Sequence, residues 1–196
     1  MAANDIRVYS GPGGPHARIQ HVRRNASETF LRGEPVAINA DGELTESADD
    51  PLAPDLFGIA QEPKSASTLN WRTNAAYTTG DMTPVVVPDL TTYFVTDNYS
   101  SGGSAFDDVV PSAANVGDEA GLTVLSGVWG IDISATNNTC RIIDVLNGQG
   151  RSVQETGETL TLQSAGGRYS IVFQIVAHQG VPAGAADSSM AEAPEA

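Results

Sequence analysis

Short apolar runs recur between residues 33 and 178, and each is closed by glycine, proline, asparagine or aspartate. No stretch shows three turns of an amphipathic helical period. PVVVP, at 84–88, predicts a short strand with its ends near a sheet edge, because proline cannot donate a ladder hydrogen bond. RYSIVFQIVA, at 168–177, is apolar on both faces and predicts a central strand. We therefore expect a mainly β chain, folded as a small barrel or sandwich of short antiparallel strands.

Two dipeptides indicate where strands turn back on themselves. EPVAINADGELT, at 34–45, places Asp41-Gly42 between two apolar runs. A two-residue Asp-Gly loop supplies the positive φ angles of a type I′ turn, so a hairpin is predicted there. Asn147-Gly148 gives a second hairpin signal before RSVQE.

The composition divides the chain into three parts. Residues 1–32, with a Gly/Pro cluster at 11–15, are predicted to be an extended basic N-terminal arm that a neighbouring surface must order. Residues 33–178 form the predicted β-rich body. Residues 179–196 are acidic, rich in Ala, Gly and Pro, and poor in large apolar side chains. Because such a segment buries too little surface to offset its ordering entropy, we expect a flexible tail.

The net charge of −14 is unevenly distributed. Residues 1–33 hold five arginines against Asp5 and Glu28, a balance of +3, so residues 34–196 carry −17. An acidic body repels phosphates, and we therefore predict no nucleic-acid partner. The first residues lack a basic stretch followed by an apolar run, and no window approaches about 18 apolar residues. We expect neither a secretory signal nor a membrane partner.

The stretch NADGELTESADD, at 39–50, collects carboxylates around Gly42. An EF-hand loop with Gly42 at its sixth position needs oxygen ligands at its first and last positions, where this chain has Ala37 and Ala48. The sequence therefore predicts no EF-hand, no metal and no cofactor, and we expect a solvated acidic loop. An irregular calcium site that uses Asp49, Asp50 or Asp55 stays open as an alternative.

No catalytic set of residues stands out. The chain has no G-x-S-x-G elbow, and its lone Cys140 is expected to be a small buried apolar residue. His178 follows an apolar strand, while His16 and His21 lie in the arm, which would not hold a base at a fixed geometry. We predict that the chain is not an enzyme. A hydrolase that uses the acidic stretch 41–55 is the weakest alternative.

The arm offers a binding surface instead. Its arginines and histidines are interspersed with apolar residues, and guanidinium groups bind carboxylates through paired hydrogen bonds. The alternative is a disordered tail that happens to be basic. The predicted contact residues are Arg7, Arg18, Ile19, His21, Val22, Arg23, Arg24, Phe30 and Arg32.

The order of short motifs in the body resembles that of a known family. The motifs are GEPVAI (33–38), DLFGIAQEP (55–63), TPVVVPDLTTYF (83–94), NVGDEAGL (115–122), GVWGIDIS (127–134) and CRIIDV (140–145). This order is similar to that of the capsid decoration, or cement, proteins of tailed bacteriophages. The resemblance covers roughly residues 33–177. The chain is longer than the smallest such proteins, so the loop at 98–118 is expected to be an insertion.

The resemblance implies a non-enzymatic virion protein on the outer surface of the capsid, made in the host cytoplasm. It would bind the major capsid protein, stabilise contacts between capsid subunits, and associate with copies of itself, for example as a trimer. A second function class stays open, namely a head-fibre or tail-associated module that binds carbohydrate or a receptor. Its aromatic candidates are Trp71, Tyr77, Tyr93, Tyr99 and Trp129.

Overall fold

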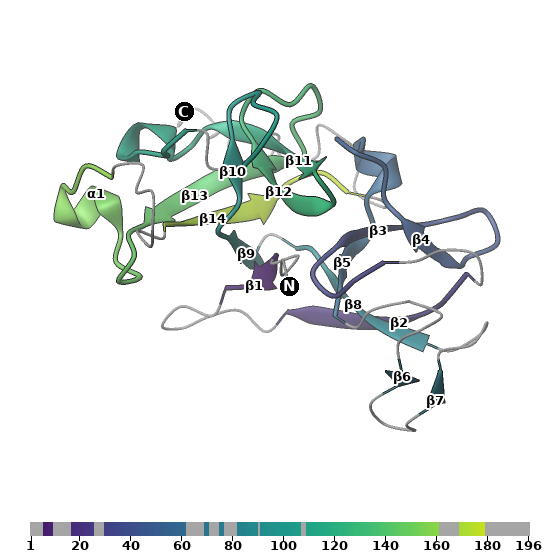
Figure 1. Cartoon of the computed structure of the whole chain (residues 1–196). Helices are drawn as coiled ribbons and strands as arrows, with labels where there is room; N and C mark the ends of the chain where they lie inside the picture. Colours follow the sequence, from purple (N-terminus) through teal and green to yellow (C-terminus); the bar gives the residue numbers. More distant parts are fainter. Residues whose placement is uncertain are drawn as a thin grey trace, which may run out of the picture.

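The computed structural model describes residues 6–9, 17–25, 30–61, 69–70, 75–76, 82–89, 91–106, 109–160 and 169–178. Within these residues the chain forms a seven-stranded and a five-stranded sheet, with a small ribbon of β6 (Leu69–Asn70) and β7 (Ala75–Ala76) (Figure 1). The prediction of a mainly β chain is confirmed. Of the two predicted architectures, the structure favours the sandwich, because neither sheet closes into a barrel.

The seven-stranded sheet contains most of the second half of the chain. Its order is β1 (Arg7–Val8), β9 (Tyr93–Thr96), β14 (Ser170–Ile175), β13 (Cys140–Leu146), β11 (Glu119–Leu125), β12 (Val128–Asp132) and β10 (Tyr99–Ser100). Neighbouring strands are antiparallel except for β10 and β12, which are parallel. Strand β14 lies between β9 and β13, which confirms the prediction of a central strand in RYSIVFQIVA.

The five-stranded sheet has the order β2 (Arg18–Arg23), β8 (Met82–Val87), β5 (Gly58–Ala60), β3 (Pro35–Ile38) and β4 (Leu44–Glu46). All its neighbours are antiparallel. Strand β8 therefore has partners on both sides, and Pro84 lies inside it rather than at its end. Just beyond β2, a single parallel bridge joins Arg24 to Leu44 of the opposite edge strand.

The N-terminal segment supplies an edge strand to each sheet. Strand β1 pairs with β9, and β2 pairs with β8, so residues 7–8 and 18–23 run antiparallel to residues 94–95 and 82–87. The sequence predicted an extended arm ordered by a neighbouring surface. The described part of this segment is extended, and the surface that orders it belongs to the same chain. Backbone groups along β8 and β9 provide the pairing partners that an isolated arm would lack.

The helices are short, which agrees with the absence of an amphipathic helical period in the sequence. In the part of the chain that the structure describes, they are two 3₁₀ turns, at Ala53–Asp55 and Ala113–Asn115, and a single α-helical turn, α1 (Val153–Thr156). Helix α1 ends at Gly157, whose φ of +65° lies in the left-handed region that glycine adopts without strain.

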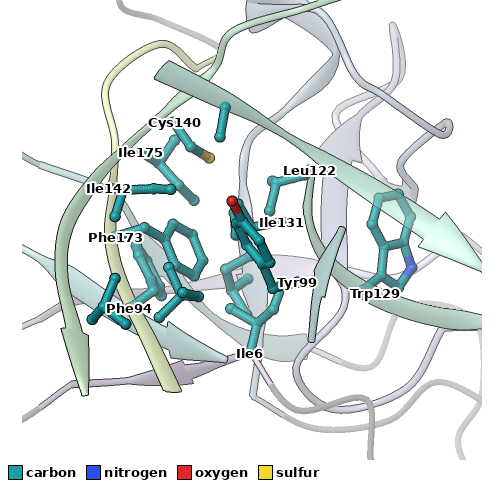
Figure 2. Packing of buried hydrophobic residues seen from close by; sticks show 14 of the residues in the cluster. Ile6, Phe94, Tyr99, Leu122, Trp129, Ile131, Cys140, Ile142, Phe173 and Ile175 are labelled. Carbon is teal, nitrogen blue, oxygen red and sulfur yellow. The ribbon is translucent and has the colours of Figure 1, made fainter. Parts of the chain in front are cut away.

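Two hydrophobic cores form on opposite faces of the five-stranded sheet. The main core lies between the sheets, where Ile59 and Val86 meet residues of the seven-stranded sheet. At its centre Phe94 and Phe173 stack with their ring centroids 5.7 Å apart (Figure 2). The second core, on the other face, is formed by Val22, Phe30, Val36, Leu44, Ala60 and Val85. Because both faces are covered, the run Val85–Val87 is continuously apolar rather than alternating.

Of the two predicted hairpins, the first joins two strands, β3 and β4, whereas the second returns by a single bridge, Leu146 to Ser152, before α1 begins at Val153. The turns of both differ from the prediction. At the first, Gly42 N donates to Asn39 O (3.0 Å), Asn39 N donates to Glu43 O (3.0 Å), and Gly42 alone has a positive φ, +75°. This is a three-residue loop, a type I turn followed by a glycine bulge, so the predicted type I′ turn at Asp41-Gly42 is wrong. The Asn39 side chain accounts for the difference. Its Oδ1 accepts from Asp41 N and Glu43 N and stabilises the longer loop.

The second hairpin repeats this arrangement. Gly150 N donates to Asn147 O (2.8 Å), and Gly150 has a φ of +75°. The Asn147 Oδ1 accepts from Gln149 N and Arg151 N. We call the pattern the Asn-x-x-Gly turn. A type I′ loop occurs elsewhere, at Ser126-Gly127 between β11 and β12, where both residues have positive φ angles.

Candidate interaction surface

Strand β2 exposes a face of basic and apolar side chains at the edge of the five-stranded sheet. Alternate residues of a strand share a face with the residues directly opposite on the neighbouring strand. On this face lie Ile19, His21 and Arg23 of β2 with Pro84 and Met82 of β8, and we call it the β2 outer face. Ile19 is 54% exposed and Met82 is 51% exposed. Val86, opposite Ile19, is buried in the main core, so the β2 outer face begins where the covering sheet ends.

Three of the nine predicted contact residues lie inside the chain. Val22 and Phe30 belong to the second core. Arg24 is fully buried, where its Nε donates to the Thr83 hydroxyl and its Nη2 donates to the Met82 carbonyl at 3.1 Å. The cause is the strand period, which turns Val22 and Arg24 towards the second core and Arg23 towards solvent. The buried three support the fold and do not present a surface to a partner.

The exposed arginines are spread over both sheets. Arg23 forms an ion pair with Glu43 of the first hairpin, Nε to Oε1 at 3.3 Å. Arg7 lies on β1, at an edge of the other sheet, where its Nη2 is 3.4 Å from Asp97 Oδ2. Arg18 begins β2 and is exposed, while Arg32 is exposed in the turn before β3. The structure therefore brings together Ile19, His21 and Arg23, with Arg18 beside them, and places Arg7 on the other sheet.

Two carboxylates of the acidic loop are hydrogen-bonded to the seven-stranded sheet and the loop after β12. Asp49 Oδ1 accepts hydrogen bonds from the Thr123 hydroxyl at 2.9 Å and from Val124 N at 2.8 Å. The Asp50 carboxylate accepts from Asn137 N at 3.2 Å. These carboxylates link the loop after β4 to the seven-stranded sheet, although Asp49 remains exposed and Asp50 is half-buried. Among the described residues, no group of three or more His, Cys, Asp or Glu side chains is placed to hold a metal ion.

Gly121 of β11 makes room for this link. A Cβ atom at Gly121 would lie 2.5 Å from the Ala135 Cβ and 2.7 Å from both Asn137 O and Asp50 Oδ1. These separations are shorter than non-bonded carbon and oxygen atoms accept, and two of the neighbours lie in the loop that follows β12. Only glycine lets that loop, the Asp50 side chain and β11 meet at this point.

Of the aromatic side chains proposed for a carbohydrate site, the three that the structure describes do not form a common surface. Tyr99 and Trp129 are buried in the main core (Figure 2). Tyr93 is half-buried on β9. Trp71 and Tyr77 lie outside the described residues. Burial of Trp129 removes the largest of the described candidates from contact with a sugar.

Cys140 is buried in the main core, which confirms its prediction as a buried apolar residue. Burial raises the pKa of its thiol to about 12, although the hydrogen bond with Thr139 acts in the opposite direction. The thiolate needed of a nucleophile is therefore strongly disfavoured. His178 is also buried, at 8% exposure, whereas His21 is exposed and His16 lies outside the described residues.

The described part of the loop at 98–118 is bound to the seven-stranded sheet. Asn98 Nδ2 donates to Trp129 O at 2.8 Å, and Gly102 N donates to Asp132 Oδ1 at 3.0 Å. Residues 99–100 add strand β10 to the edge of β12. Asp107 and Asp108 lie outside the described residues. The beginning of this loop is thus part of the sheet rather than a free spacer.

Sequence reasoning missed Met82 and Pro84 as parts of the β2 outer face. The two residues stand at alternate positions of β8, which is the signal for a shared face. The alternation is hard to recognise in the sequence because the next residues, Val85–Val87, are apolar at every position. No helix within the described residues is long and apolar enough to cross a membrane. Comparisons with protein-family models and with curated proteins found no match to the chain.

Proposed function

We propose that the chain is a structural virion protein that binds the outer surface of an assembled phage head and stabilises contacts between major capsid subunits. The observation that carries this proposal is the β2 outer face, a basic and apolar surface on a chain of net charge −14. The motif order of residues 33–177, which is similar to that of phage decoration proteins, supports it.

The β2 outer face has the chemistry of a protein-binding surface. Ile19 and Met82 supply apolar area, and removing such area from water drives association. Arg23 and His21 supply donors for carboxylates on the partner. In the ion pair between Arg23 and Glu43, the Arg23 side chain is 58% exposed whereas the Glu43 side chain is 15% exposed, so the guanidinium stays accessible to a partner although the Glu43 carboxylate is mostly buried. The net charge of −14 favours solubility of the free protein through self-repulsion.

Stabilisation of the capsid follows from preference for the assembled state. A protein that binds only assembled subunits shifts the equilibrium towards them, by mass action, in proportion to its affinity and concentration. Many copies with modest contacts then act together. Such a role needs a surface of fixed shape, and the pairing of β2 with β8 over six residues holds the β2 outer face in one conformation.

A binding experiment tests the surface. Purified chain is added to mature heads that lack it, from the phage that encodes it, and bound chain is measured by co-sedimentation. We expect the double variant Ile19→Asp/Arg23→Glu to lose at least about tenfold in affinity, since charge reversal and loss of an apolar anchor each weaken a protein interface. The matched control is Leu52→Asp/Arg141→Glu, which changes a 53% exposed apolar residue and an exposed, ion-paired arginine elsewhere.

A second measurement tests stabilisation. Heads with and without bound chain are heated, and release of DNA is followed with an intercalating dye. We expect release at a higher temperature when the chain is bound and no gain with the double variant. Equal survival of complete and deficient heads under heat and osmotic shock would contradict the stabilising role. Equal binding of the double variant and the control would contradict the assigned surface.

A further inference from the structure

The dipeptide Asn147-Gly148 has a chemical liability that the proposed function does not use. In such a pair the Gly148 nitrogen can form a bond to Asn147 Cγ, the Cγ–Nδ2 bond breaks, and ammonia leaves. Water then opens the succinimide ring to aspartate or isoaspartate. Glycine favours this reaction because it has no Cβ to obstruct the attack and because its backbone rotates freely. This is the single Asn-Gly pair in the chain.

In the folded chain both the nitrogen and the oxygen of the Asn147 carboxamide are hydrogen-bonded. Nδ2 donates to Glu158 Oε2 at 2.6 Å. Oδ1 accepts from Gln149 N and Arg151 N, each at 3.0 Å. The residue is 7% exposed. Its carboxamide therefore cannot rotate to meet Gly148 N without breaking hydrogen bonds made by both the oxygen and the nitrogen.

We propose that Asn147 is a deamidation site at which the reaction is slowed by the fold. Glu158 contributes to this protection, because its carboxylate binds the amide nitrogen that would leave as ammonia. The first hairpin offers a comparison. Asn39 occupies the same position of an Asn-x-x-Gly turn and its Oδ1 accepts the same two backbone hydrogen bonds, but it precedes Ala40. The reactive Asn-Gly sequence and the carboxylate that binds its amide nitrogen thus occur together at the second turn.

Deamidation would not reverse when the turn closes again. An aspartate at position 147 has no amide hydrogen to donate, and its carboxylate would face the Glu158 carboxylate where the amide nitrogen now lies at 2.6 Å. Two like charges at this separation repel each other. The next contacts are the bridge between Leu146 and Ser152 and the packing of Val153 in the main core. Modification is therefore expected to loosen α1 from the main core.

Mass spectrometry of the full chain tests this assignment. The chain is incubated in mildly alkaline buffer with and without urea, and trypsin then releases residues 142–151, in which conversion of the amide to the acid is measured. We expect conversion at least roughly tenfold slower in the folded chain, because the closed turn must open first. Glu158→Ala should accelerate conversion in buffer and leave the rate in urea unchanged. Glu155→Ala, a neighbouring exposed carboxylate, should change neither rate.

Further variants test whether the conversion proceeds through the Asn147-Gly148 pair. Gly148→Ala should slow conversion in urea, and Asn39 should remain an amide in every sample. Circular dichroism confirms that each variant is folded in buffer. Equal rates with and without urea would overturn the proposal that the fold protects Asn147. An unchanged rate in folded Glu158→Ala would overturn the role of Glu158.

Discussion

Asp50 and Asn137 exchange hydrogen bonds in both directions although 87 residues separate them. The Asp50 carboxylate accepts from the Asn137 backbone nitrogen, and Asn137 Nδ2 donates to the Asp50 carbonyl at 2.7 Å. Thr136 N donates to the same carboxylate at 3.0 Å. Asp50 has a φ of +48°, a conformation that non-glycine residues seldom adopt. The reciprocal bonds hold this backbone and fasten the loop after β4 to the loop between β12 and β13.

Replacement of Asp50 by alanine is expected to lower the free energy of unfolding by about 1–3 kcal/mol, because it removes a carboxylate that accepts several hydrogen bonds. Asp41→Ala, at the exposed tip of the first hairpin, is the matched control and should stay within about 0.5 kcal/mol of the parent chain. Urea denaturation followed by tryptophan fluorescence measures both. Equal effects of the two variants would show that Asp50 does not link the sheets.

Gly121→Ala is expected to destabilise the chain by about 1–3 kcal/mol, because the added methyl group overlaps Ala135, Asn137 and Asp50. Asp50→Ala removes one of these three neighbours. The double variant Gly121→Ala/Asp50→Ala should therefore lose less than the two single losses combined. Urea unfolding of the four chains gives the coupling. Strict additivity would mean that the methyl group and the carboxylate do not compete for the same space.

The two main hairpins show how much of the fold the sequence predicts. Alternating apolar runs around residues 41 and 147 located both chain reversals, because strand pairing requires a reversal wherever such runs meet. The turn type was wrong because Asp41-Gly42 and Asn147-Gly148 are only parts of a longer pattern. In each hairpin an asparagine side chain binds two backbone nitrogens, and the glycine three positions later takes the positive φ. A dipeptide rule does not include that side-chain contribution.

Gly150→Ala is expected to cost about 1–2 kcal/mol, since alanine in the left-handed region brings its Cβ too close to the backbone. Gly148→Ala should change stability by less than about 0.5 kcal/mol, because Gly148 is exposed and is not among the described glycines with positive φ. Thermal unfolding by circular dichroism compares them. A larger loss of stability in Gly148→Ala than in Gly150→Ala would instead support the two-residue turn that the sequence predicted.

Stability is expected to fall in alkali partly through Tyr99. Burial raises the pKa of Tyr99 to about 12, and the carboxylates of Asp118 and Asp132 act in the same direction. The unfolded chain releases this proton near pH 10, so the contribution is complete below that pH and is lost as pH rises towards the folded value. Tyr99→Phe should flatten the fall in urea midpoint with pH. The Cys140 thiol, whose pKa is also raised to about 12, leaves part of the fall in place. An unchanged slope in Tyr99→Phe would exclude the phenol as its source.

The candidate surface was only partly predictable. Alternation along RIQHVR separates Ile19, His21 and Arg23 from the residues of the other face, and this separation follows once the segment is known to be a strand. Its partner β8 is distant in sequence, and nothing local identifies it. The burial of Arg24 was therefore not foreseeable, because the Thr83 hydroxyl and the Met82 carbonyl that accept from it come from that distant strand.

The pairing of β1 with β9 and of β2 with β8 also sets an order for folding. Arg7 contacts Asp97 and Arg24 contacts Thr83, at sequence separations of 90 and 59 residues. During synthesis the N-terminal segment emerges first, yet it has no strand to join until β8 and β9 have been made. Contacts of such long range form slowly, and until they form, β8 and β9 present unpaired backbone to other chains. Strands β1 and β2, which are translated before β8 and β9, thus join their sheets only after those later strands exist.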